Sequence, residues 1–201
     1  MSENNRKEKN HIVETIFEWV ETFCVALFAV VMIFTFACRF VTVDGQSMMQ
    51  TFHHGDRLII SDLFYTPKTG DVVVVQDANE KHLEGPVIKR VIATAGETVD
   101  IDPETWTVTV TDTDGNERVL DESYVNFEEG YPMYIPTSES YYTNALTLDE
   151  YPHTVDEGCI FVMGDNRNHS LDSRFLGDID ERKILGKAYV RIFPNPTFDF
   201  K

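Results

Sequence analysis

The sequence of 201 residues is poor in cysteine, and this restricts how its fold can be stabilised. Two of its three cysteines, Cys24 and Cys38, lie in an apolar N-terminal segment, which leaves Cys159 alone in the rest of the chain. A single cysteine cannot form a disulfide within its domain, and no cysteine spacing typical of a zinc site is present. The domain must therefore be stabilised by its core alone, and we expect no metal and no organic cofactor.

Basic residues are also scarce. There are 17 lysines and arginines against 34 aspartates and glutamates, which gives a formal net charge of −17, nearly all of it after residue 43. An acidic domain repels the phosphates of nucleic acids, so nucleic acid is excluded as a partner, and such a domain is poorly suited to lying flat on anionic lipid. Solubility is the simplest explanation of the charge. The length suffices for one folded domain with an anchor.

The chain has one long apolar segment, near the N-terminus. Residues 22–38 carry no charge and would measure about 25 Å as a helix, close to the short limit for crossing a bilayer. The residues before this segment keep a helical pattern, and Trp19 suits the headgroup region. We expect a cytoplasmic tail at 1–11, an interfacial and transmembrane helix at 12–42, and an extracytoplasmic domain at 43–201.

The expected orientation follows from the charges on the two sides of this segment. Arg6, Lys7 and Lys9 on the N-terminal side favour keeping that end in the cytoplasm. Arg39 on the other side opposes this only weakly. The segment could also be a cleaved signal peptide, a lipoprotein signal or a buried helix of a soluble protein. No good small-X-small cleavage site is present, and the residues before Cys38 fit a lipoprotein signal only in part. A buried helix would contain more polar residues.

After residue 43 the sequence predicts a mainly β domain, because runs rich in Val, Ile, Thr and Tyr are separated by Gly, Pro and Asp. Residues 112–116 could form a calcium loop, but their glycine comes too early for an EF-hand, and a hairpin turn is favoured. Segments 61–65 and 180–183 could be short helices or turns. The expected strands are 57–61, 71–76, 86–93, 105–111, 159–163 and 186–193.

The composition changes between residues 117 and 154. This stretch is acidic and contains six tyrosines and three prolines. We interpret it as an inserted acidic, tyrosine-rich lobe, or as a system of long surface loops. Its aromatic side chains are expected to form a small local core rather than a platform for a ligand.

One serine and one lysine are suited to nucleophilic catalysis. Ser47 follows the apolar segment closely, and Lys89 lies inside an apolar run. A serine hydroxyl is a poor nucleophile unless a base removes its proton, and a lysine can be that base only where its surroundings keep it neutral. Lowering a lysine pKa by two to three needs roughly 3–4 kcal/mol, which desolvation can supply. On a strand, Lys89 would point inward and Arg90 would point the other way.

Four motifs that contain these residues occur in order along the chain. Their residues are Ser47, Met48 and Thr51; Gly55, Asp56, Arg57 and Leu58; Lys89, Arg90, Val91, Ile92, Gly96 and Glu97; and Gly164, Asp165, Asn166, Arg167, Ser170, Asp172, Ser173 and Arg174. Together they resemble the bacterial type I signal peptidases, a family of membrane-anchored proteases with a Ser/Lys dyad, and in particular the single-anchor Gram-positive type. The resemblance covers nearly the whole chain.

The resemblance implies a role for particular residues. Ser47 would be the nucleophile, with its backbone N–H as a donor to the oxyanion, and Lys89 would be the general base. Ser170 would orient the lysine by a hydrogen bond. The other residues that the resemblance implies are a structural pair near that serine, Asp172 and Arg174, and two residues of the substrate pocket or oxyanion region, Gly45 and Met48.

The resemblance also implies a function and its partners. The protein would be a membrane-bound serine endopeptidase with a signal-peptidase-like β domain, and 43–201 would be its catalytic domain. It would remove signal peptides from exported precursors after small-X-small sites. Its partners would be those precursors, the lipid bilayer of the cell membrane and, by contact, the secretion machinery.

The chain departs from the family pattern at three places. Gln50 replaces a proline that stiffens the turn behind the nucleophile, which puts the pre-organisation of that turn in question. Gly45 stands where some members have a serine whose hydroxyl is a further oxyanion donor. Residues 93–95 replace the more usual glycine and proline of their turn.

Other functions and another base remain as alternatives. A non-cleaving, membrane-anchored assembly factor or chaperone of the same fold, as occurs among pilus-associated relatives, is compatible with Gln50, whereas the retention of both Ser47 and Lys89 argues against it. A self-cleaving repressor would need a DNA-binding helix pair, which is missing. His53, His54 and His169 could replace the lysine as base, but none has a clear orienting acid in the sequence.

Overall fold

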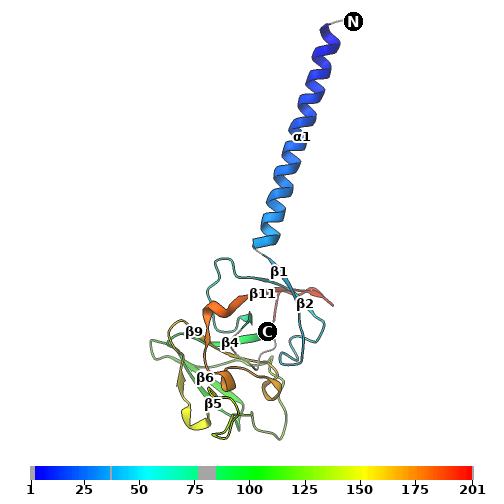
Figure 1. Cartoon of the computed structure of the whole chain (residues 1–201). Coiled ribbons are helices and arrows are strands. Elements are labelled where there is room, and N and C mark those ends of the chain that lie inside the picture. The colour runs from blue at the N-terminus through cyan, green and yellow to red at the C-terminus, as the bar shows by residue number, and fades with distance from the viewer. Residues whose placement is uncertain (1–2, 37, 77–84, 201) are drawn as a thin grey trace. The chain divides into compact units, whose positions relative to one another are not determined.

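The structure of the protein is a computed structural model, which describes residues 3–36, 38–76 and 85–200. In the N-terminal helix, side chains are described only for residues 13–32. The chain divides into two compact units, Met1–Arg39 and Phe40–Lys201. Figure 1 shows both units, and each is described by itself below.

The first unit is a single helix, α1 (Glu3–Phe36). Its segment Val13–Met32 has a mean hydropathy of 1.8, so it is a candidate membrane span by length and composition, and its side chains are exposed. The helix begins inside the expected tail, because the Glu, Lys and Arg residues there are good helix formers. Residues 1–2 of that tail lie outside the described residues. The expected helix end is wrong, since the β-branched and aromatic run Arg39–Thr42 forms a strand.

The second unit contains two β-sheets, so the mainly β fold class is confirmed. In Figure 1, β5 and β6 of the smaller sheet lie below β4 and β9 of the larger one. The larger sheet has the order β1 (Arg39–Thr42), β2 (Arg57–Ser61), β11 (Ile184–Phe193), β3 (Val72–Val75), β4 (Val87–Thr94), β9 (Cys159–Met163) and β10 (Ile179–Asp180). The smaller sheet has the order β7 (Glu117–Val119), β6 (Thr107–Thr111), β5 (Thr98–Asp102) and β8 (His153–Thr154).

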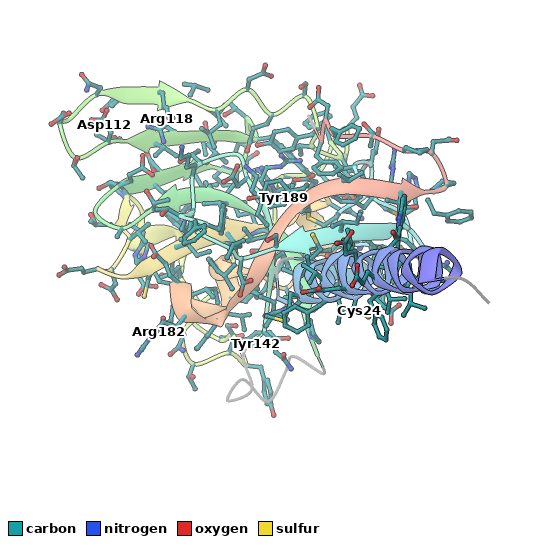
Figure 2. The ribbon with its side chains drawn as sticks, turned by 90° about the horizontal axis from the view of Figure 1, so that it is seen from above. Cys24, Asp112, Arg118, Tyr142, Arg182 and Tyr189 are labelled. Carbon is teal, nitrogen blue, oxygen red and sulfur yellow. The ribbon has the colours of Figure 1, made fainter. Side chains whose placement is uncertain are left out.

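Four short helical elements complete the second unit. They are η1 (Leu148–Glu150), η2 (Arg167–His169), α2 (Ser173–Leu176) and η3 (Glu181–Lys183). The expected short element at 180–183 therefore corresponds to η3. The expected hairpin turn joins β6 to β7, where the Asp112 side chain accepts from the backbone N–H groups of Asp114 and Asn116. Figure 2 shows Asp112 at this turn.

The stretch 117–154 does not form a lobe of its own, so the expected inserted lobe is not confirmed. Met133 is fully buried in one cluster with Ile92 of β4 and Phe161 of β9. A sheet has to bury its apolar face against another layer, and the loops of this stretch cover the smaller sheet in that way. The residues that pack against the cluster from this stretch are Leu120, Val125, Ile135, Leu146 and Tyr151.

Strand β4 carries Lys89 and Arg90, two residues of the motifs that the sequence analysis singled out. It pairs with β3 on one side and, from Arg90 onward, with β9 on the other. Residues 88–93 are all buried, because β4 is covered on both faces. Lys89 shares its face with Val87 and Val91, while Arg90 points to the opposite face. The alternation that the sequence predicts therefore separates two buried environments instead of a buried one from an exposed one.

Candidate active site

Ser47 and Lys89, which are 42 residues apart in the chain, meet in the structure. Ser47 lies in a series of turns after β1, and Lys89 lies on β4. The Lys89 Nζ donates a hydrogen bond to the Ser47 Oγ over 2.8 Å. Lys89 is 3% exposed, while Ser47 is half-buried. A neutral amine at this position could instead accept the proton of the hydroxyl, which is the first requirement of base catalysis.

The surroundings of Lys89 favour the neutral amine. Burial lowers the pKa of this amine from its usual 10.5 to about 8. Among the nearby charges, Asp172 and Asp165 act in the opposite direction, and Arg174 lowers the pKa further. No carboxylate forms an ion pair with Lys89 among the described residues, so desolvation is not offset by a direct counter-charge.

Asp172 and Arg174 form a fully buried ion pair next to the lysine. The Asp172 carboxylate accepts from the Arg174 Nε and Nη2, both at 2.9 Å, and from the backbone N–H of Gly164 at 3.0 Å. Burial alone would raise the pKa of Asp172, but Arg174 and these hydrogen bonds outweigh burial and hold it below its usual range. The carboxylate is thus committed to the arginine and to the backbone of Gly164, which fixes the end of β9.

Ser170 lies close to this pair but does not make the hydrogen bond to Lys89 that the family resemblance implies. Its Oγ is buried, and it satisfies hydrogen-bond geometry with no described residue. The structure therefore places Ser170 in the same buried cluster, with its hydroxyl unpaired.

Gly164 allows two parts of the site to approach each other. A Cβ atom at this position would lie 2.3 Å from the Ser170 Oγ and 2.4 Å from the Ser47 carbonyl oxygen. Contacts under 3.0 Å force a displacement, and here one partner is backbone that cannot rotate away. The motif around Gly164 was evident in the sequence, but nothing in the sequence indicates this close approach.

A second buried ion pair lies on the other face of β4. Arg90 donates from Nε and Nη2 to the Asp165 carboxylate, at 2.8 and 2.7 Å, and the Thr51 hydroxyl donates to the same carboxylate. The Tyr124 ring lies 3.7 Å from the Arg90 guanidinium, and burial raises the pKa of this tyrosine to about 12. Arg167, next in the chain but one to Asp165, pairs instead with Glu122. The stretch 117–154 therefore contacts the motif of Arg90 through Tyr124 and the motif of Arg167 through Glu122.

A cavity of about 720 Å³ lies beside the Ser47 turn. Its lining includes Val87 and Ile88, on the part of β4 before its pairing with β9 begins, and also Gly45. Gly45 has a φ of +92°, so a serine at this position would be strained. Met48 does not line the cavity; it is buried in the cluster beneath. The lining residues are 41–45, Leu58, Val74 and 85–88.

The three histidines that could have served as the base have other contacts. The His54 Nδ1 lies 3.0 Å from Asp44, and the His169 Nε2 lies 3.0 Å from Glu128; both rings are exposed. His53 uses its backbone N–H on Asp56. Among the hydrogen bonds of the described residues, the Ser47 hydroxyl has an amine partner and no imidazole partner.

Comparison with known proteins first defines the class. From residue 16 to residue 193 the chain matches the family model described as "Signal peptidase, peptidase S26". Signal peptidase I of Bacillus licheniformis is 32% identical over 198 residues, which cover 96% of this chain and 94% of the relative. Signal peptidase IB of Staphylococcus aureus (strain MRSA252) is 29% identical over 195 residues, with 92% and 93% covered. On these sequence matches the protein is a protease.

The family then follows from the same matches. The chain belongs to the signal peptidase family, peptidase S26, and its resemblance to the bacterial type I enzymes is confirmed. A solved structure of a signal peptidase I from Enterococcus faecalis is 25% identical, covers 61% of this chain and 97% of its own, and has a TM-score of 0.43.

Proposed function

We propose that this protein is a membrane-anchored serine endopeptidase that removes signal peptides from exported precursors, with Ser47 as nucleophile and neutral Lys89 as general base. Membership of the signal peptidase family supports the removal of signal peptides. The observation that carries the assignment of residues is the 2.8 Å hydrogen bond between a buried amine and a half-buried hydroxyl. The lowered pKa of Lys89 supports the role of base, since a free lysine would be almost wholly protonated at neutral pH.

The proposed reaction has two steps. The Lys89 amine takes the proton of the Ser47 hydroxyl while the Oγ attacks the scissile carbonyl, whose oxygen becomes negatively charged and accepts from the Ser47 backbone N–H. Collapse of this intermediate breaks the peptide bond, and the ammonium returns the proton to the leaving amine. Water, activated by the same amine, then hydrolyses the ester and restores Ser47.

The substrate is expected to lie extended along the free part of β4. Val87 and Ile88 pair with β3, and β9 begins its pairing only at Arg90, so the second edge of this part has no strand partner among the described residues. An extended peptide can add to such an edge by main-chain hydrogen bonds, while a side pocket selects its side chains. The adjacent cavity would receive the small residues of a small-X-small site.

The proposed location is the cell membrane. The candidate span Val13–Met32 would cross the bilayer once, with the N-terminus in the cytoplasm and the catalytic domain outside. This arrangement would keep the enzyme in the membrane from which its precursors emerge. Contact with the secretion machinery is part of the same proposal.

Cleavage of a secretory precursor tests the proposal against the non-cleaving assembly factor. The full chain, purified in detergent, is mixed with a precursor that has alanine at positions −3 and −1 before its cleavage site. We expect the mature product from the wild type and none above background from Ser47→Ala. If the folded wild type produces no mature product at any pH between 7 and 10, the assembly factor becomes the better proposal.

A further inference from the structure

Three carboxamide side chains form a continuous hydrogen-bonded chain around the turn that carries Ser47. Gln50 donates from Nε2 to the Asn126 Oδ1 over 3.2 Å, and Asn126 donates from Nδ2 to the Asn166 Oδ1 over 3.0 Å. Asn166 in turn donates from Nδ2 to the Gln46 carbonyl oxygen, also over 3.0 Å. This series of hydrogen bonds thus begins at one end of the nucleophile turn, residues 46–50, and returns to the other end.

The direction of these bonds fixes the orientation of each amide group. A carboxamide has a donor end and an acceptor end, and every link joins the donor of one group to the oxygen of the next. Asn166 is 3% exposed and also donates its backbone N–H to the Ser47 carbonyl oxygen over 3.0 Å. Two consecutive carbonyls of the nucleophile turn are therefore held by one residue, whose own side chain is oriented by Asn126.

Asn126 connects this chain to the stretch 117–154. Its backbone N–H donates to the Asp165 carbonyl oxygen over 2.9 Å, and the Asp165 carboxylate is held by Arg90. The middle link is thus attached to a buried ion pair rather than to a free loop. Gln50, the first link, is exposed, so its carboxamide is the part of this network that is open to solvent.

We propose that Asn126 is a positioning residue, which acts through Gln50 and Asn166 to hold the nucleophile turn, residues 46–50. This inference rests on the proposed function for its kinetic part. A serine has to be placed within a few tenths of an ångström for attack, and a displacement of about 1 Å can lower the rate about 100-fold. Loss of one link loosens the turn without removing a reacting group, so the effect falls on kcat and leaves substrate binding intact.

The kinetic test uses the full chain in detergent and a peptide with alanine at positions −3 and −1. Asn126→Ala is expected to lower kcat about tenfold and to change KM by less than about twofold. The apparent pKa near 8 should stay in place, because the surroundings of Lys89 are unchanged. Asn144→Ala, at an exposed asparagine of the same stretch, is the matched control and should keep the wild-type kcat.

A double-mutant cycle decides whether the carboxamides act as one unit. Gln50 is exposed, so Gln50→Ala tests the first link at a site where the fold tolerates change. We expect about a threefold fall in kcat from Gln50→Ala, and no further fall when this change is added to Asn126→Ala. Wild-type kcat in both single variants, or losses that multiply in the double variant, would overturn the inference.

Hydrogen exchange provides a readout that does not depend on cleavage. Amide exchange in the peptide that contains residues 46–50 should be faster in Asn126→Ala and in Gln50→Ala than in the wild type, and unchanged in Asn144→Ala. Unchanged exchange in the first two variants would refute the positioning role even if the protein cleaved normally. Absence of cleavage in the wild type, with faster exchange in these variants, would refute the proposed function and leave the positioning role supported.

Discussion

Two lysines in one row of the larger sheet have opposite surroundings. Val73 of β3 pairs with Lys89 of β4 on one side and with Lys187 of β11 on the other, so the three side chains share a face. The Lys89 amine is buried and contacts the hydroxyl of Ser47. The Lys187 side chain is 30% exposed, and its amine forms an ion pair with the Asp71 carboxylate. Both lysines lie opposite Val73 on a neighbouring strand, and they differ in the partner of the amine and in its access to water.

One face of a sheet can thus give two lysines different surroundings. A carboxylate partner favours the charged amine, and partial exposure keeps it hydrated. Tyr65 and Tyr189 add aromatic faces within 6 Å of the Lys187 amine; Figure 2 shows Tyr189 on β11. A hydroxyl partner in a buried site has no such preference, so desolvation decides, and the pKa of Lys89 falls to about 8.

The largest expected difference between the two lysines is in cleavage. Lys89→Met removes the proposed base and should lower kcat by at least about 1,000-fold. Lys187→Met removes a structural ion pair and should leave kcat within about twofold of the wild type. The measurement is cleavage of the alanine-containing peptide at pH 9 by folded variants. Comparable losses in the two variants would contradict the distinction between a catalytic and a structural lysine.

The two substitutions should also change stability in opposite directions. Holding the pKa of Lys89 at about 8 instead of 10.5 corresponds to about 3 kcal/mol of unfavourable burial of charge. Lys89→Met is therefore expected to stabilise the folded state by about that amount at pH 7, as an upper limit. Lys187→Met should destabilise it by about 1 kcal/mol or less.

The pH dependence of the stability difference has a definite sign. Below pH 8 the Lys89 amine is protonated in both states, so the folded state carries the full penalty. Between pH 8 and 10.5 only the unfolded state is protonated, and the stability of the wild type rises with pH. The advantage of Lys89→Met, measured by urea unfolding, should therefore shrink across this window. An advantage that is constant from pH 7 to 10.5 would show that the penalty is not one of charge.

The rate of cleavage should depend on pH through the same group. Only the neutral amine can accept the Ser47 proton, so kcat should rise about tenfold per pH unit below about 8 and level off above it. The profile of Lys187→Met should coincide with that of the wild type. An inflection near 6.5 that disappears in His54→Ala would transfer the role of base to a histidine.

The sequence predicted the parts of the fold that have a strong local pattern. The runs that form β2, β3, β4, β6, β9 and β11 were all expected, because their β-branched residues are bounded by turn residues. Strands β8 and β10 have two residues each, and their pairing with β5 and β9 depends on neighbours far along the chain. The alternation in β5 was a local signal and was overlooked.

The candidate site was predictable to the extent that its residues belong to motifs. Ser47 and Lys89 could be predicted to lie together, because their motifs imply the nucleophile and the base of one reaction. The roles of Gly164 and Asn126 could not be predicted from the sequence. The role of Asn126 depends on contacts with residues 40 or more positions away in the chain, and that of Gly164 depends on the close approach of two backbone segments. Loops reach a site through tertiary contacts, and the polar residues of a loop have no sequence periodicity from which such a contact could be predicted.

The smallest expected effect is that of removing the carboxylate from the Lys187 site. Asp71→Asn leaves the amine without its counter-charge but still partly in water, so the folded state should lose only about 0.2–1 kcal/mol. The loss should be smaller at high salt, because ions screen exposed charges and do not reach buried ones. Unfolding by urea at low and high salt, with Lys187→Met and the double variant, isolates the coupling between the two groups. A coupling of several kcal/mol that salt does not change would mean that Lys187 behaves as a buried charge, and burial would then no longer distinguish it from Lys89.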